Sequence, residues 1–388
     1  MGTFRSAIWC TVCVLWLTAC DSRMSPYRLV TPVPADPDGF SLALYQSVGV
    51  RLEPGHSIAF VNDGAIFDRL ADELARAKQS INVVLFIWRP SLPSSRLVPI
   101  IAERARAGVA CRILVDSAGS TDFEDAVGPE LKKAGCEVRL ARALEMGKLN
   151  HRNHRKIVVI DGTLGVTGGF GIDDEWLGGG RAKNEWRDSN AFVRGPAVNE
   201  LQQAFAENWQ EAGGALLPAA DFPRLEASGP TRAGFVTSTP SPILTKADRV
   251  VQLLISAATK RVWITNPYFT PSPGLQDLLI EKRRQGVDVR VLVAGDETDF
   301  KQVLREQRAS YPELLEGGVL IWEYQPTLIH TKTIVVDDQL AIIGSINLDR
   351  LSLTAMDEGA LVMADPHVVE HLARDWEEDV KFSRQIRE

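Results

Sequence analysis

Apolar residues recur along the chain with two alternating spacings. Between residues 66 and 77 they fall three or four positions apart, which places them on one face of a helix; they are Ile66, Phe67, Leu70, Leu74 and Ala77. A nearly continuous apolar stretch follows at 81–88, as in strands that are buried on both faces. A second helix is predicted at 97–107, and a second strand at 108–115. Helices that alternate with such strands predict a mainly parallel sheet covered on both faces.

The same order returns in the second part of the chain. A helical pattern at 250–258 is followed by an apolar strand at 262–264, a helix at 275–285 and a strand at 286–293. The strings Gly-Val-x-x-Arg-x-Leu-Val that begin at Gly108 and Gly286 lie 178 positions apart. Such a repeat indicates a duplicated structural unit. We therefore expect an α/β fold of two similar halves, each with its own mainly parallel sheet flanked by helices.

Composition places boundaries around these halves. Residues 20–45 are rich in Pro, Asp and Ser, which is typical of a tether. A stretch rich in Pro, Ala and Gly at 213–242 is expected to be a linker. The N-terminal half is then expected at 46–212, and the C-terminal half at 243–388.

The first nineteen residues are typical of an export signal. Arg5 provides positive charge, and the apolar core from Ala7 to Leu17 is shorter than the roughly 20 residues that span a bilayer. The string Leu-Thr-Ala-Cys that ends at Cys20 resembles a bacterial lipobox, whose cysteine is lipidated; an ordinary secretory signal or a short uncleaved anchor is the alternative. The resemblance implies an exported lipoprotein that faces the periplasm, and Asp21 favours the inner membrane.

Bulk composition is that of an ordinary globular protein, with 45% hydrophobic and 24% charged residues. The net charge of −7 argues against a general nucleic-acid binder, so no nucleic acid is expected as a partner. Cys111 and Cys136 are each expected to open a strand. Export would permit a disulfide between them, but two reduced core thiols are the favoured interpretation.

Each half carries one copy of a polar motif. The copies comprise His154, Lys156 and Asp161 in the first half, and His330, Lys332 and Asp337 in the second. The two histidines lie 176 positions apart, close to the spacing of the surrounding repeat. On a strand, residues two positions apart point to the same face, so each copy projects an imidazole and an ammonium together.

This pair of side chains suits phosphoryl transfer. Lysine binds phosphate oxygens as a point charge, and histidine acts as a nucleophile or a general acid. Two copies facing each other across a pseudo-two-fold axis would surround one phosphate, so that one imidazole attacks phosphorus and the other protonates the leaving alcohol. Asp161 and Asp337 are expected to fix the turn after the motif rather than to contact substrate.

Each imidazole also needs a carboxylate that fixes its tautomer. Asp188 and Glu358 are the candidates, because they lie in matching places, 34 and 28 residues after the motif histidine of their own half. His151 has no counterpart in the second half and is expected in a loop. The remaining histidines are expected at the surface: His56, His367 and His371. Buried structural histidines beside solvated lysines are the alternative interpretation, which the duplication disfavours.

The two His-x-Lys-x4-Asp copies resemble the HKD motifs of the phospholipase D superfamily, over nearly all of the chain after residue 55. Other strings resemble bacterial cardiolipin synthases of the phospholipase D type: Thr167-Gly168-Gly169, Asp174-Glu175-Trp176, Trp186-Arg187-Asp188, Gly195-Pro196-Ala197-Val198, Asn266-Pro267-Tyr268-Phe269 and Gly344-Ser345-Ile346-Asn347. The resemblance implies one active site shared by two halves, a covalent phosphohistidine intermediate, and no metal or other cofactor.

Carried over residue by residue, the resemblance implies a site that contains His154, Lys156, Asp188, His330, Lys332, Ser345, Asn347 and Glu358. It implies that His154 is the nucleophile and His330 the general acid, with Ser345 and Asn347 binding phosphate or substrate. Two positions depart from the family pattern, in which asparagine is common: Gly171 and Met356. These positions concern the placement of the acceptor alcohol.

The sequence thus predicts a phosphatidyltransferase that forms cardiolipin from phosphatidylglycerol. Hydrolysis by the same residues, with water as acceptor, and a phosphodiesterase or nuclease on the same fold are alternatives. A non-catalytic lipid-binding lipoprotein is disfavoured because both motifs are intact. The expected partners are a phospholipid and the membrane, through Cys20. No oligomer is required, since one chain contains both halves.

Overall fold

The computed structural model describes residue 29 and residues 31–142, 150–241 and 244–387. The expected signal peptide and Cys20 lie outside the described residues, so the export prediction is not addressed by the fold. Among the helices in these ranges, none combines the length and the apolar character that crossing a membrane requires.

The first half alternates strands and helices. Its elements are α2 (Pro37–Val48), β1 (Glu53–Asn62), α3 (Ala65–Ala75), β2 (Ser80–Leu85), α4 (Leu92–Arg106), β3 (Ala110–Asp116), η1 (Phe123–Val127), α5 (Gly128–Ala134), β4 (Glu137–Ala141), β5 (Ile157–Ile160), β6 (Leu164–Gly168), η2 (Asp174–Trp176), β7 (Ser189–Arg194) and α6 (Val198–Glu211).

The second half repeats this order. After η3 (Ala219–Asp221) come β8 (Thr231–Ser238), α7 (Lys246–Ala257), β9 (Arg261–Asn266), α8 (Pro273–Arg284), β10 (Asp288–Ala294), α9 (Lys301–Ala309), α10 (Tyr311–Glu316), β11 (Leu320–Tyr324), β12 (Thr333–Val336), β13 (Leu340–Gly344), α11 (Arg350–Thr354), β14 (Glu358–Ala364), α12 (Pro366–Val380) and β15 (Ser383–Ile386).

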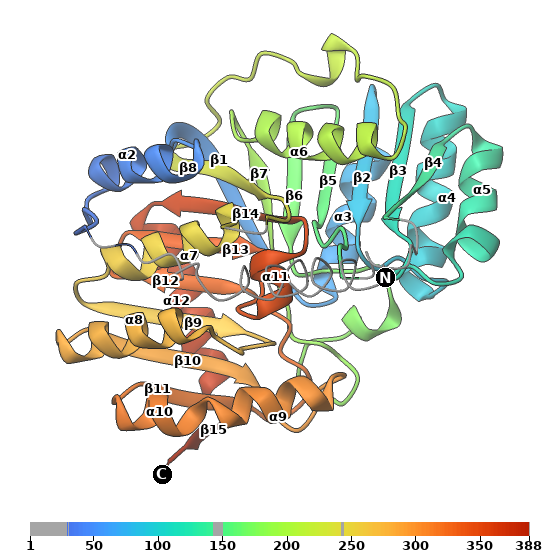
Figure 1. Ribbon diagram of the computed structural model, residues 1–388. Coiled ribbons are helices and arrows are strands. Elements are labelled where there is room, and N and C mark those ends of the chain that lie inside the picture. The colour runs from blue at the N-terminus through green and yellow to red at the C-terminus, as the bar shows by residue number, and fades with distance from the viewer. Residues whose placement is uncertain (1–28, 30, 143–149, 242–243, 388) are drawn as a thin grey trace, which may run out of the picture.

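The two halves are matched strand for strand (Figure 1). Their strand orders are β1-β7-β6-β5-β2-β3-β4 and β8-β14-β13-β12-β9-β10-β11, and β15 is added at the outer edge of the second. A short, irregular pairing of β1 with β8 joins them into one 15-stranded sheet. The duplicated α/β fold is therefore confirmed, whereas the expectation of one separate sheet for each half is wrong.

The prediction of a mainly parallel sheet is also wrong. Only β2-β3-β4 and β9-β10-β11 pair in parallel, and the other neighbours are antiparallel. The pattern misleads because an antiparallel strand that is buried on both faces is as continuously apolar as a parallel one. The hairpins β5–β6 and β12–β13 have connections too short for a parallel crossover.

Two segments expected to be a tether and a linker contain regular structure. The helix α2 begins at the Asp36 cap and buries Phe40 and Leu44. It packs against α7 of the second half (Figure 1). Strand β8, within the expected linker, pairs with β14. The apolar spacing of α2 and the nearly continuous burial of β8 outweigh their Pro- and Gly-rich surroundings.

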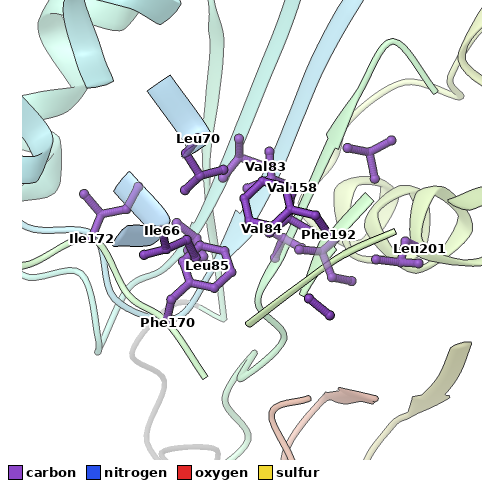
Figure 2. Close-up of a cluster of buried hydrophobic side chains, with 14 of the residues drawn as sticks. Ile66, Leu70, Val83, Val84, Leu85, Val158, Phe170, Ile172, Phe192 and Leu201 are labelled. Atoms are coloured by element: carbon purple, nitrogen blue, oxygen red, sulfur yellow. The ribbon is translucent and has the colours of Figure 1, made fainter. Parts of the chain in front are cut away.

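Helices and sheet enclose a continuous apolar core. Figure 2 shows part of it in the first half, where Leu70 of α3 and Leu201 of α6 lie on either side of the strand residues Val84 and Phe192. The same cluster of buried side chains continues into the second half through Phe235, and so joins both halves.

Two further expectations are settled by the fold. Cys111 and Cys136 form a disulfide with Cα atoms 4.6 Å apart, so the interpretation as reduced thiols is wrong. His56 is fully buried rather than at the surface, because its Nδ1 donates to the Thr231 carbonyl of β8 and its Nε2 accepts from the amide of Ala197.

The motif aspartates connect neighbouring strands. Asp161 and Asp337 both adopt left-handed backbone conformations, with φ of 54° and 51°. Their carboxylates accept hydrogen bonds from consecutive backbone amides at the start of the adjacent strand: Lys78, Gln79 and Ser80 for Asp161, and Thr259, Lys260 and Arg261 for Asp337. They fasten the end of β5 to the start of β2 and the end of β12 to the start of β9, and so hold each motif strand against its neighbour.

Candidate active site

Each motif is held in place by backbone atoms of the opposite half. The His–Lys segments lie immediately before β5 and β12. The amide of His154 donates to the carbonyl of Asp357 at 2.9 Å, and the amide of His330 donates to the carbonyl of Arg187 at 2.7 Å. The segment before each motif strand therefore bridges to the other half, which brings the two histidines toward one cavity.

The carboxylates that orient the histidines are exchanged between the halves. Nδ1 of His154 lies 3.0 Å from Oε1 of Glu358, and Nδ1 of His330 lies 2.9 Å from Oδ2 of Asp188. Both acids are fully buried. Each Nδ1–H that donates to its acid leaves the Nε2 of the same ring available for chemistry. The two acids predicted from the sequence are thus in contact with histidines, each with the one in the other half.

Other side chains fix these two acids. The Glu358 carboxylate accepts from the hydroxyls of Ser345 and Ser352. The Asp188 carboxylate accepts from the Trp176 indole N–H at 2.8 Å. Ser345 also accepts the amide of Gly359, so the structure places it behind the acid rather than against substrate, where the sequence had placed it.

Two of these supporting residues were not predicted. Ser352 follows the motif without a characteristic spacing, and no sequence signal identifies it. Trp176 lies in a family string, and a buried indole N–H needs an acceptor. The sequence could therefore have predicted that the Trp176 N–H donates a hydrogen bond, but not that Asp188 accepts it.

Both motif lysines are buried beside the histidines. Lys156 and Lys332 are 2% and 3% exposed, and each ammonium donates to the carbonyl of its own motif histidine. Burial lowers the pKa of Lys156 to about 8. Burial, together with the charge of Lys156, lowers the pKa of Lys332 to about 7, although Asp188 and Glu358 oppose this.

The electrostatics favour neutral imidazoles and charged acids. Burial and the Lys332 charge lower the pKa of His330 to about 3, and burial lowers that of His154 despite the nearby Glu358. Burial alone would raise the pKa of Asp188 and Glu358, but the imidazoles and lysines beside them hold both below their usual values. An uncharged imidazole with a free Nε2 lone pair is the form that can attack phosphorus.

A cavity of about 530 Å³ opens onto this site. It is lined by His154, Lys156, His330 and Asn347, whose buried Oδ1 has no hydrogen-bond partner among the described residues. Its mouth carries exposed apolar side chains, including Phe300, which is 57% exposed. The site can thus take a phosphate deep inside and apolar chains at its opening.

The two departures from the family pattern both line this cavity. At Gly171 an added Cβ would lie 2.9 Å from the Trp176 ring, so the indole takes space that an asparagine side chain would need. Met356 also faces the cavity. His151, in contrast, is exposed and is not among the residues that line the cavity. The described residues contain no group of three or more His, Cys, Asp or Glu suited to a metal.

Comparison with known proteins supports the fold and the family. The phosphatidylserine synthase of Haemophilus influenzae Rd KW20 superposes with a TM-score of 0.64 at 14% identity, over 89% of this chain and 92% of that structure. The cardiolipin synthase of Geobacillus kaustophilus (strain HTA426) is 33% identical, and cardiolipin synthase 2 of Bacillus anthracis is 32% identical. Both alignments cover 84% of this chain but only 66% and 64% of the relatives, so the chain spans slightly less than two thirds of their length.

The model of the family described as "Cardiolipin synthase, PLD-like domain" matches residues 70–209 and 251–380. These segments correspond to the two halves of the structure, and each contains one complete motif. Because the matched segments make up more than half of the chain, the protein belongs to the cardiolipin synthase family of phospholipase D-like proteins.

Proposed function

We propose that the protein is a phosphatidyltransferase that forms cardiolipin and glycerol from two molecules of phosphatidylglycerol. The observation that carries this proposal is the pair of buried histidines in one cavity, each oriented by an acid of the other half. Lys156 lines the same cavity, and Lys332 is buried beside His330. The names of the relatives support the substrate class. The apolar mouth is suited to acyl chains.

The proposed reaction is a double displacement. Nε2 of His154 attacks phosphorus, the bond to the glycerol headgroup breaks, and His330 protonates the leaving oxygen. The negative phosphodiester beside two lysines offsets their charge and so favours the protonated form of His330. A hydroxyl of the second phosphatidylglycerol then gives its proton to His330 and attacks phosphorus, which releases His154 and forms cardiolipin. Water in place of the second lipid would give phosphatidic acid.

The lysines and acids have separate tasks in this proposal. Lys156 and Lys332 bind the nonbridging phosphate oxygens, whose charge grows in the transition state. Glu358 stabilises the imidazolium character that His154 acquires when its Nε2 bonds to phosphorus, and Asp188 does the same for protonated His330.

We also propose that the protein acts from the outer side of the inner membrane, tethered through lipidated Cys20. The disulfide between Cys111 and Cys136 supports export, because disulfides persist in oxidising compartments. Replacing Cys20 with serine should move the protein from the membrane to the soluble periplasmic fraction, as measured by fractionation and immunoblotting. Unchanged membrane attachment would refute the lipid anchor.

The transferase proposal is tested with purified protein, phosphatidylglycerol vesicles and chelator, followed by lipid analysis. Wild type should yield cardiolipin and glycerol, and His154→Ala and His330→Ala should each reduce turnover by at least a thousandfold. The matched control is His151→Ala, which should retain most activity because this side chain is exposed outside the cavity. Phosphatidic acid as the sole product would identify a hydrolase, and full activity in either motif variant would refute the shared site.

A further inference from the structure

The two histidines face chemically different surroundings although the scaffold around them is duplicated. The ring of Phe86, which follows β2, lies 5.1 Å from the His154 ring. Tyr268, in the corresponding loop after β9, lies 6.4 Å from the His330 ring, and its hydroxyl donates to Asp299 at 2.8 Å. An apolar ring therefore stands beside one histidine, and a tyrosine–carboxylate pair beside the other.

The His330 side also has aromatic walls and a second carboxylate. The rings of Trp176 and Trp186 lie 5.3 and 5.1 Å from the His330 ring. Glu175, next to Trp176, lines the cavity, and its carboxylate has no hydrogen bond or ion pair with any described residue. Burial and the negative charges of Asp173 and Asp299 raise the pKa of Glu175.

Catalysis as proposed leaves these two carboxylates without a task. His330 is already oriented by Asp188, and neither Glu175 nor Asp299 contacts a motif lysine. Extra negative charge in a cavity for an anionic phosphodiester is unfavourable unless the ligand supplies hydrogen-bond donors. The buried Oδ1 of Asn347 in the same cavity also has no hydrogen-bond partner among the described residues, so it is open to a donor on a ligand.

We propose that the His330 side of the cavity is the subsite for the head alcohol, and that Glu175 and Asp299 select a polyol by accepting hydrogen bonds from its hydroxyls. This inference rests on the proposed function. The attacking and leaving groups lie on opposite sides of phosphorus in an in-line displacement. A head alcohol held beside His330 is therefore opposite Nε2 of His154, and the diacyl part lies toward Phe86.

A neutral polyol fits this subsite better than an ammonium headgroup. Burial raises the pKa of both Glu175 and Asp299, and the nearby positive charges of Arg89 and Lys332, respectively, oppose this rise. A further positive charge on the ligand would be repelled by Arg89 and Lys332. Hydroxyl groups satisfy the carboxylate oxygens without adding charge, as the glycerol headgroup of phosphatidylglycerol would.

The test compares Glu175→Gln and Asp299→Asn with wild type on phosphatidylglycerol, phosphatidylmethanol and phosphatidylethanolamine vesicles. Glu297→Gln is the matched control, because this partly exposed residue lies in the same loop as Asp299 but does not line the cavity. Both test variants should lose about tenfold or more in kcat/KM for phosphatidylglycerol, as expected when a charged hydrogen-bond acceptor is removed. Release of methanol from phosphatidylmethanol, whose head alcohol has no further hydroxyl and for which water is the acceptor, should stay within about twofold of wild type.

Retained phosphatidylmethanol turnover also shows that the variants fold. Unchanged selectivity in the variants, an equal loss on both donors, or a wild-type preference for phosphatidylethanolamine would overturn the polyol subsite while leaving phosphatidyl transfer intact. A wild type inactive on all three donors would overturn the proposed function and the subsite with it.

Discussion

At the scale of residues, the site consists of two pairs in which each histidine and its acid belong to different halves. The Nδ1 contacts of 3.0 Å in the His154–Glu358 pair and 2.9 Å in the His330–Asp188 pair are nearly equal. Their tasks in the proposed reaction nevertheless differ, because one pair attacks phosphorus and the other protonates the alcohol. This difference can be measured with a substrate whose leaving group needs no proton.

The first prediction concerns that substrate. Asp188→Asn and Glu358→Gln should each lower kcat on phosphatidylglycerol by about a thousandfold, since each leaves its imidazole misoriented. A p-nitrophenyl ester of phosphatidic acid has a leaving group that departs without protonation. It should restore the first displacement to Asp188→Asn and His330→Ala, seen as a burst of about one p-nitrophenolate per enzyme, but not to Glu358→Gln or His154→Ala. Turnover after the burst should stay slow, because the second displacement still needs His330 as the base. If this substrate instead rescued Glu358→Gln and His154→Ala, His330 would be the nucleophile.

The second prediction concerns pH. Because the pKa values of Lys332 and Lys156 are lowered to about 7 and about 8, both ammonium groups are charged below pH 7 and lose their protons as pH rises through this range. The kcat/KM of the free enzyme should therefore fall on the alkaline side, with a first midpoint near pH 7. Lys332→Arg should move that midpoint upward, since a guanidinium stays protonated. If kcat/KM of the wild type did not change from pH 6 to 9, deprotonation of these lysines would not control the reaction.

The sequence predicted the histidines, lysines and acids that the structure brings together, because the proposed chemistry requires fixed residue types at fixed spacings. It did not identify which acid serves which histidine, because that depends on how the halves face each other. It also placed Ser345 against substrate, whereas its hydroxyl is used by Glu358. Contacts such as that of Trp176 with Asp188 are made by packing and leave no spacing in the sequence.

At the scale of elements, the helices and strands near the motifs follow from apolar periodicity, but their pairing does not. Period and burial predict that a segment is a strand; they do not distinguish parallel from antiparallel neighbours when both faces are covered. The helix α2 was missed for the opposite reason, because its three buried apolar residues, Phe40, Leu44 and Val48, stand in a Pro-rich context. The composition of a segment averages over all its residues, whereas the packing of a helix depends on the residues of one face.

The third prediction concerns the disulfide between β3 and the start of β4. It closes a loop with a sequence separation of 25 residues, and replacing both cysteines with serine should lower the free energy of unfolding by about 3 kcal/mol. Activity at 25 °C should persist, because the bond lies at the opposite end of β3 from Asp116, which holds the amide of Asn153 beside the motif.

Urea denaturation with and without reductant measures this effect. Reductant should destabilise wild type and leave the double-serine variant unchanged, which is the control. A wild type equally stable in both conditions would show that the crosslink adds nothing to stability.

At the scale of the whole molecule, one hydrophobic cluster and several buried ion pairs connect the halves. Arg187 of the first half lies 2.9 Å from Asp379 of α12, and both side chains are almost completely buried. The core cluster contains residues from both halves. The halves therefore resemble one folding unit more than two domains joined by a linker.

The fourth prediction is a single calorimetric unfolding transition. Arg187→Ala should lower the stability of the whole molecule by about 3–5 kcal/mol. It removes the buried partner of Asp379, which then keeps only the partly exposed Arg181, and it also breaks the pair with Asp63. Arg374→Ala is the control: its pair with Glu370 is exposed, and its loss should cost at most about 1 kcal/mol. Two resolved transitions, or a loss confined to one of them, would show that the halves unfold separately.

The exchange of acids between the repeats also bears on how such a chain can evolve. Two identical copies of a single repeat, arranged about a two-fold axis, would each lend an acid to the histidine of the other. In a fused chain each repeat still depends on the acid of the other, so neither repeat can change its acid or histidine freely. Compensating substitutions among relatives should therefore link Asp188 with the surroundings of His330, and Glu358 with those of His154, across more than 140 residues of sequence.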